Sequence, residues 1–204
     1  MAFPSALASI LTGASPSQLA NWRQHPALLV PEIQTSPRAL YSFQDLVALR
    51  TFVHLRKEVP LQRIRKALAG LRELDLTEHP SRYQFTTDGE SVFLVENGVA
   101  VDLVRKGQIV ITSLENVYGP FINLQGHEVV DFQRPRPLLR VDVARLGGWP
   151  TIDGTRVAFD SVASLVEGGL PPERVANYYP RVGREAALDA LSLQESINHV
   201  GEAA

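Results

Sequence analysis

The chain has 204 residues, a formal net charge of −2 at pH 7 and no cysteine. This length is enough for one large domain or two small ones, and the lack of cysteine excludes disulfide bonds, thiolate metal sites and cysteine nucleophiles. Because no apolar run approaches membrane-spanning length and the amino terminus lacks a signal-peptide pattern, we expect a soluble, cytoplasmic protein.

The first predicted feature is a helix-turn-helix. Apolar residues recur at helical spacing in its first helix: Phe3, Leu7, Ile10 and Leu11. Gly13 then interrupts the helix. Ser15 is expected to cap a second helix, with Pro16 at the first helical position and Gln18 completing a capping box. This geometry places a helix in a DNA major groove, although a purely structural helical pair has the same pattern.

A hairpin and two more helices are predicted next. The apolar runs 28–31 and 38–41 are expected to form the two arms of the hairpin. Ser42 is expected to cap a third helix, with Asp45 in its first turn complementing the helix dipole. Its predicted buried residues are Leu46, Leu49 and Val53. A fourth helix begins near Pro60, and its predicted buried residues are Leu61, Ile64, Leu68 and Leu71.

This order of elements resembles the winged-helix DNA-binding domain of the MerR family. Residues 41–46 (Tyr-Ser-Phe-Gln-Asp-Leu) follow the family's Tyr-Ser-x-x-Asp-Leu pattern, and residues 59–64 match the start of its fourth helix. The resemblance implies a DNA-binding domain over residues 1–76. The sequence departs from the family at residues 20–22, where Ala-Asn-Trp replaces Arg-Tyr-Tyr or Arg-Tyr-Trp, and at residues 32–33, where Glu-Ile replaces a more basic wing.

The second helix supplies the expected base contacts. Ser17, Gln18 and Asn21 face away from Leu19, and Gln and Asn pair with adenine in the major groove. Gln18 alternatively serves only as part of the cap. Trp22 either lies at the groove edge or anchors the helix to its own core. The basic residues of the expected DNA-binding set either contact phosphate or simply face solvent. The full set is Ser15, Ser17, Gln18, Asn21, Trp22, Arg23, Arg38, Tyr41, Lys57, Arg63 and Lys66.

Charge is unevenly distributed along the chain. Residues 1–80 hold nine Lys/Arg and six Asp/Glu, residues 81–140 hold six and seven, and residues 141–204 hold five and nine. A basic first part suits phosphate contact, whereas an acidic end is repelled from DNA.

Residues 82–137 are predicted to form an antiparallel meander of three or four strands. Pro80 precedes it and prevents the fourth helix from continuing into a dimerisation helix. Asp88-Gly89 and Asn97-Gly98 lie between β-branched runs and are strong hairpin signals. Gly107 marks a turn before a strand at residues 109–111. The region is interpreted as a connector or dimer interface, with a small-ligand pocket as the alternative.

Two further features end this region. One more strand is predicted around Val129-Val130. Residues 134–137 (Arg-Pro-Arg-Pro) are extended and basic, and we interpret them as a linker to the last part of the chain.

Residues 138–204 are predicted to form a module of three short helices after a tight turn at Asp153-Gly154. Asp160 is expected to cap the first helix, which ends at Gly168-Gly169. Its predicted apolar face is Val162, Leu165 and Val166. Pro171 opens a second helix, carrying Val175 and Ala176, that stops before Pro180. The third helix begins near Gly183 and extends as far as Ile197. Its predicted buried residues are Ala187, Leu188 and Leu191.

The pattern Gly-x-Pro-x-Ile-x-Gly-Thr-Arg-Val at residues 148–157, followed by these helices, is similar to a widespread bacterial domain of unknown function carried by many small antitoxins. With a MerR-like start and a β-rich middle, the architecture resembles VapB-type antitoxins whose partner is a PIN-domain ribonuclease. Short VapB proteins block the nuclease with an arginine-bearing tail, but residues 192–204 contain no Lys or Arg. The expected toxin-binding residues are therefore Arg156, Arg181 and Arg184, with a steric block as the alternative.

Nothing in the sequence indicates an enzyme, a metal site or a cofactor. The five histidines show no metal-ligand spacing, the acidic residues show no paired arrangement and there is no glycine-rich phosphate loop. We expect an α+β protein that acts as a homodimeric, DNA-binding antitoxin. The alternatives are a MerR-like, ligand-responsive transcription regulator and, with less support, a protein-binding scaffold without a DNA role.

Overall fold

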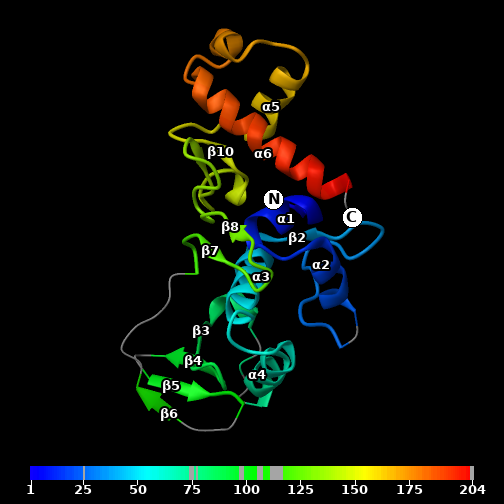
Figure 1. The fold of residues 1–204 in the computed structure, drawn as a ribbon, viewed down its shortest axis with the longest axis vertical. Coiled ribbons are helices and arrows are strands. Elements are labelled where there is room, and N and C mark those ends of the chain that lie inside the picture. The colour runs from blue at the N-terminus through cyan, green and yellow to red at the C-terminus, as the bar shows by residue number, and fades with distance from the viewer. Residues whose placement is uncertain are drawn as a thin grey trace.

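The computed structural model describes residues 1–24, 26–73, 76, 78–96, 99–104, 108–110 and 117–202. Helices and small antiparallel sheets both contribute, which confirms the predicted α+β class. Figure 1 shows the amino-terminal helices in the middle of an elongated molecule, with the carboxy-terminal helices at one end and a four-stranded sheet at the other. Among the described residues, no helix combines the length and apolar character that a bilayer crossing requires.

Short strands and helices alternate along the chain. The α-helices are α1 (Ser5–Thr12), α2 (Pro16–Arg23), α3 (Phe43–Leu55), α4 (Leu61–Glu73), α5 (Phe159–Glu167) and α6 (Arg184–Glu202). The 3-10 helices are η1 (Pro80–Arg82), η2 (Leu146–Gly148) and η3 (Pro172–Asn177). The strands are β1 (Phe3–Pro4), β2 (Leu40–Tyr41), β3 (Gln84–Thr87), β4 (Val92–Glu96), β5 (Val99–Asp102), β6 (Gln108–Val110), β7 (Phe121–Ile122), β8 (Glu128–Val129), β9 (Leu139–Arg140) and β10 (Thr151–Ile152).

The turn between α1 and α2 has the predicted chemistry. Gly13 ends α1 with φ of +77°, and a Cβ added there would lie 2.4 Å from Cγ2 of Val129, so the position requires glycine for its backbone and for space. Ser15 Oγ accepts a hydrogen bond from the Gln18 amide at 3.2 Å, and Gln18 Oε1 accepts one from the Ser15 amide at 2.8 Å. The capping box is therefore confirmed, with Pro16 at the first helical position.

The predicted hairpin is wrong in its pairing. Residues 28–31 form no strand, because Leu28 and Leu29 are buried in the core and their amides donate to the Trp22 carbonyl oxygen. β2 instead pairs antiparallel with β1, and a single bridge joins Leu40 to Gln34. Phe3 consequently lies in a strand and not in the first helix. An apolar run has the same composition whether it forms a strand or a loop that fills the core. Its strand pairing therefore cannot be predicted from the run itself.

The third and fourth helices follow the prediction closely. Ser42 Oγ accepts from the Asp45 amide at 3.0 Å, and Asp45 Oδ2 accepts from the Ser42 amide at 2.7 Å, which caps α3. The predicted residues Leu46, Leu49 and Val53 of α3 are buried. In α4, Ile64 and Leu71 are buried, whereas Leu61 and Leu68 are partly buried.

The meander is confirmed as a four-stranded antiparallel sheet in the order β3-β4-β5-β6. Its first turn contains Gly89 with φ of +83°, as the Asp-Gly pair predicts. The predicted turns at Asn97-Gly98 and Gly107, and the end of the last strand at Ile111, lie outside the described residues. The further strand expected around Val129-Val130 does not join the meander, because β8 pairs with β7 in a separate hairpin.

The carboxy-terminal module contains the three predicted helices with changes in detail. Ala158, not Asp160, precedes the first helical residue of α5, and Asp160 lies in the first turn, where its Oδ1 accepts from Trp149 Nε1 at 3.3 Å. The second helix is the 3-10 helix η3, and α6 continues past Ile197 to Glu202. Gly154 has φ of +71°, which confirms the predicted turn. In α6, Ala187, Ala190 and Leu193 are buried, whereas Leu188 and Leu191 are half-buried.

Helix α6 joins the two ends of the chain. It packs along α1, and Ile10 of α1 lies against the carboxy-terminal core. The rings of Phe3 and Trp149 are 5.6 Å apart. In the segment predicted to be a linker, Arg136 donates to Ser196 Oγ on α6 at 2.8 Å, so this part of the segment is docked on the module.

Candidate functional site

Helix α2 presents one face outward and is anchored by the other. Leu19 and Trp22 are buried at 1% and 3% exposure, whereas Ser17 and Asn21 are exposed. Trp22 therefore anchors the helix to its own core. Gln18 is half-buried and engaged in the cap, so Ser17 and Asn21 are the polar side chains that α2 offers to a partner.

A groove of about 450 Å³ lies beside this face, between α2 and the last turn of α6. Its lining residues are Ser5, Pro16, Ser17, Ala20, Arg23, His199 and Val200. Figure 1 shows the end of α6 close to α2. A partner that approaches Ser17 and Ala20 along this edge therefore also meets the carboxy-terminal helix.

Arg23 is held at the wall of this groove by a buried tyrosine. Its Nη1 donates to Tyr41 Oη at 3.3 Å. Burial raises the pKa of Tyr41 above its ordinary value, and Arg23 partly opposes that shift, so the phenol stays neutral. Tyr41 is 1% exposed and positions Arg23 from the core.

The other basic residues predicted to contact phosphate lie outside α2, Arg38 just before β2, Lys57 just after α3, and Arg63 and Lys66 on α4. Arg38 and Lys66 are exposed. Lys57 Nζ lies 5.7 Å from the centre of the Phe121 ring, and Arg63 Nη1 donates to the carbonyl oxygens of Gly89 and Glu90. Figure 1 shows α4, which carries Arg63 and Lys66, next to the meander, and α4 contacts β4. From the predicted set, the structure brings together Ser15, Ser17, Gln18, Asn21, Trp22 and Arg23 at α2, with Trp22 buried and with the buried Tyr41 behind Arg23.

The residues predicted to bind a toxin lie on the carboxy-terminal module. Arg156 and Arg181 are exposed. Arg184 is also exposed, but its guanidinium forms ion pairs with Glu173 at 2.8 Å and with Glu185 at 3.0 Å. Arg156 and Arg181 are therefore the two members of the set for which no ion pair competes among the described contacts.

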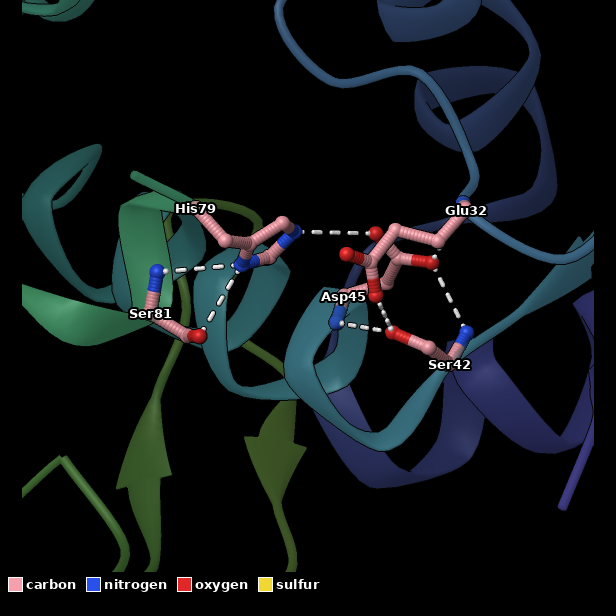
Figure 2. A network of polar contacts seen from close by, with 5 residues as sticks. All are labelled: Glu32, Ser42, Asp45, His79 and Ser81. Carbon is pink, nitrogen blue, oxygen red and sulfur yellow. Dashed lines mark hydrogen bonds and ion pairs between the residues drawn. The ribbon is translucent and has the colours of Figure 1, made fainter. Parts of the chain in front are cut away.

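Sequence reasoning missed a cluster of two carboxylates and an imidazole. Asp45, fully buried in the first turn of α3, lies with Oδ1 3.1 Å from Nε2 of His79. The carboxylate of Glu32 completes a group whose ligand atoms all lie within 4.8 Å of one another. Figure 2 shows the three side chains converging from three chain segments. Because these residues are far apart in the sequence, no local spacing indicates the cluster.

The sequence analysis also did not predict a buried arginine that connects several segments at the centre of the molecule. Arg50 of α3 is 0% exposed and donates to five carbonyl oxygens, those of Leu11, Val117, Tyr118, Gly119 and Val130. Burial lowers the pKa of Arg50 to about 10, with Asp131 opposing the shift, so the guanidinium remains charged at neutral pH. It joins α1 and α3 to the segment that carries β7 and β8.

Two cavities bear on the predicted alternative of a ligand-binding middle region. A pocket of about 20 Å³ borders the meander at Phe85 and Thr87 and holds no more than a water molecule. A groove of about 320 Å³ lies at the start of α3, where Phe43, Phe132 and Arg140 contribute to its walls. A small ligand would therefore fit beside α3 better than at this edge of the sheet.

Comparison with known proteins finds a family match for one part of the chain. Residues 140–193 match the family described as "Protein of unknown function (DUF433)". This agrees with the predicted domain of unknown function and covers about a quarter of the chain. The fold is similar to the crystal structure of Rv2018 from Mycobacterium tuberculosis, with a TM-score of 0.52 and 18% sequence identity over 94% of this chain and 100% of that chain. None of the curated proteins matches the chain.

Proposed function

We propose that the protein is the DNA-binding antitoxin of a type II toxin–antitoxin pair, which represses its own operon and neutralises a PIN-domain ribonuclease. The observation that carries the DNA-binding half is the outward face of α2. A capped helix follows a tight turn, is anchored by Leu19 and Trp22, and displays Ser17 and Asn21 to solvent. This is the arrangement that a recognition helix needs in a major groove.

The roles of the α2 residues follow from their chemistry. The Asn21 amide both donates and accepts hydrogen bonds, so it is suited to the bidentate contact with adenine. Arg23, at the carboxy-terminal end of α2, and the exposed Arg38 would contact phosphate. A homodimer would place two copies of α2 in successive major grooves about one DNA turn apart.

The toxin-binding half is assigned to the carboxy-terminal module. It is supported by the match of residues 140–193 to a domain of unknown function. The sequence pattern of residues 148–157 also resembles a domain that many small antitoxins carry. Arg156 and Arg181 are exposed on the module and would reach the nuclease, with a steric block as the alternative.

Binding of the full chain to its own promoter, measured by fluorescence anisotropy, tests the DNA-binding half. Asn21→Ala should weaken binding at least fivefold, since a good bidentate base contact contributes about 1–3 kcal/mol of discrimination. The matched control is Gln125→Ala, an exposed amide in the β7–β8 turn, which should bind like wild type. Equal affinity of the Asn21 variant and wild type would remove α2 from the interface.

The proposal requires that a PIN-domain ribonuclease be encoded beside the gene, and co-expression with that ribonuclease tests the toxin-binding half. Simultaneous Arg156→Ala and Arg181→Ala should restore growth inhibition by the toxin. Arg174→Ala, an exposed arginine on the same module, is the control. Full neutralisation by the double variant would exclude these arginines and favour the steric block.

A ligand-responsive regulator is the second candidate, and the groove of about 320 Å³ beside Phe43 and Phe132 favours it. The aromatic walls and Arg140 would suit a small molecule with an apolar body and a polar group. Native mass spectrometry of the purified chain should then show a bound small molecule that is lost on denaturation. A spectrum with the mass of the chain alone would count against this function.

A further inference from the structure

We propose that Glu32, Asp45 and His79 form a binding site for one divalent transition-metal ion of the zinc class. The three residues come from the loop before β2, the first turn of α3 and the segment just before η1. Their ligand atoms lie within 4.8 Å of one another, although 13 residues separate Glu32 from Asp45 and 34 separate Asp45 from His79. The fold thus brings the group together from three segments.

The donor set suits the proposed ion. One imidazole nitrogen and two carboxylate oxygens are ligands that zinc and its neighbours accept, whereas calcium and magnesium favour oxygen donors alone. Zinc–ligand bonds of the usual length hold tetrahedral ligand atoms about 3.3 Å apart. His79 Nε2 and Asp45 Oδ1 are already 3.1 Å apart. Glu32 is exposed and, among the contacts of the described residues, only its Oε2 accepts a hydrogen bond, from Ser42 Oγ, so a change of its side-chain torsions would close the remaining distance.

Each proposed ligand is oriented by a second contact, as metal ligands in proteins usually are. Asp45 Oδ2 accepts from the amides of Ser42 at 2.7 Å and Glu32 at 3.0 Å, which leaves Oδ1 directed at His79. Ser42 Oγ donates to Glu32 Oε2 at 2.6 Å. The Nδ1 atom of His79 lies 2.9 Å from Ser81 Oγ, so the imidazole is held at its far side (Figure 2).

The hydrogen bonds of His79 also identify the proton that the metal ion would replace. Nδ1 of His79 accepts from the Ser81 amide at 3.2 Å, so in the metal-free protein Nε2 carries the proton and donates it to Asp45 Oδ1. Coordination through Nε2 requires that this proton leave that nitrogen. The metal-bound state then uses the tautomer with the proton on Nδ1, which donates to Ser81 Oγ and gives up the hydrogen bond from the Ser81 amide. The ion would also neutralise two carboxylates, one of which is fully buried.

Ion binding would link three parts of the amino-terminal region. It would fix the loop before β2 and the segment before η1 to the start of α3. Because an ion that binds only the folded chain stabilises it by mass action, the metal should raise the melting temperature. The proposal is independent of DNA or toxin binding, because its test uses neither partner.

The test is calorimetric titration of the untagged, chelator-treated full chain with ZnCl2, with CoCl2 absorption as a second probe of the ligand set. Wild type should bind one equivalent at micromolar concentration, raise its melting temperature and give a visible cobalt band. His79→Gln should weaken binding at least tenfold, and Glu32→Gln should weaken it severalfold. His127→Gln, which alters an exposed histidine in the β7–β8 turn, should bind like wild type.

Several results would overturn the proposal. These are no saturable zinc binding by wild type, equal binding by the His79 variant, loss of binding in the His127 variant, or, in a parallel titration with MgCl2, magnesium binding as tight as zinc. Circular dichroism checks that each variant is folded. If His79→Gln fails to fold, Glu32→Gln decides, because its altered side chain is exposed, and wild-type affinity in that variant would reject the site.

Discussion

The guanidinium of Arg50 donates to the carbonyl oxygen of Leu11 at 2.6 Å, which joins the middle of α3 to the last turn of α1 just before the chain turns into α2. The same side chain donates to four carbonyl oxygens of the segment around β7 and β8. The helix that leads into α2 is therefore joined to an internal residue that contacts neither DNA nor toxin in the proposed function.

Replacing Arg50 by methionine should destabilise the fold by about 3–5 kcal/mol, because the apolar side chain leaves several buried carbonyl oxygens without donors. Urea denaturation followed by circular dichroism measures this change in the free energy of unfolding. Arg38→Met, at an exposed arginine, should change it by less than about 0.5 kcal/mol. Similar stabilities for the two variants would show that the Arg50 contacts are not needed for folding.

The turn at Gly154 isolates a backbone effect from a packing effect. Gly154 has φ of +71°, and a Cβ added there meets no atom within 4 Å. Gly154→Ala should therefore cost about 1–2 kcal/mol through left-handed backbone strain alone. Gly201→Ala, at an equally open position in α6 with no positive φ, should be neutral or stabilising. Thermal unfolding of both variants measures the difference in stability. A Gly154 variant as stable as wild type would contradict the expected backbone strain.

Arg38 and Arg63 should respond differently when their charge is removed. Arg38 is exposed, so Arg38→Gln should reduce the slope of log K against log salt by about one in promoter-binding titrations. The Arg63 guanidinium is engaged with the Gly89 and Glu90 carbonyl oxygens, so Arg63→Gln should lower stability by about 0.5–1.5 kcal/mol and leave the slope nearly unchanged. Arg174→Gln is the control for a distant exposed charge. The reverse pattern would transfer the phosphate contact from Arg38 to Arg63.

Local sequence chemistry predicted the elements whose causes are local. The caps at Ser15 and Ser42, the glycine turns and the alternation of the meander each act within a few residues, and the structure contains them. The pairing of β1 with β2 is different in kind, because two-residue strands more than thirty positions apart carry no periodic signal. Pairing of this type depends on which side chains the core accepts.

The parts of the site that escaped prediction are also non-local. Arg50 is an ordinary helix residue in sequence, and only the folded chain surrounds it with carbonyl oxygens. The five histidines were expected to be surface or capping residues, and His79 does cap η1 through the Ser81 amide, but its contact with the buried carboxylate of Asp45 was not predicted. Similarly, the amphipathic pattern of α6 indicates a helix but not that its last turn borders α2.

The groove between α2 and α6 yields the last prediction. His199 and Arg23 both line it, so a carboxylate at position 199 would repel phosphate and draw the Arg23 guanidinium away from DNA. His199→Glu should weaken promoter binding about two- to fivefold at low salt, which is the scale of one exposed charge pair, and the difference should shrink as salt is added. His127→Glu makes the same charge change at an exposed site in the β7–β8 turn and should have a smaller effect. Equal weakening by both variants would mean that net charge alone is sensed, and that the end of α6 does not border the DNA-binding face in solution.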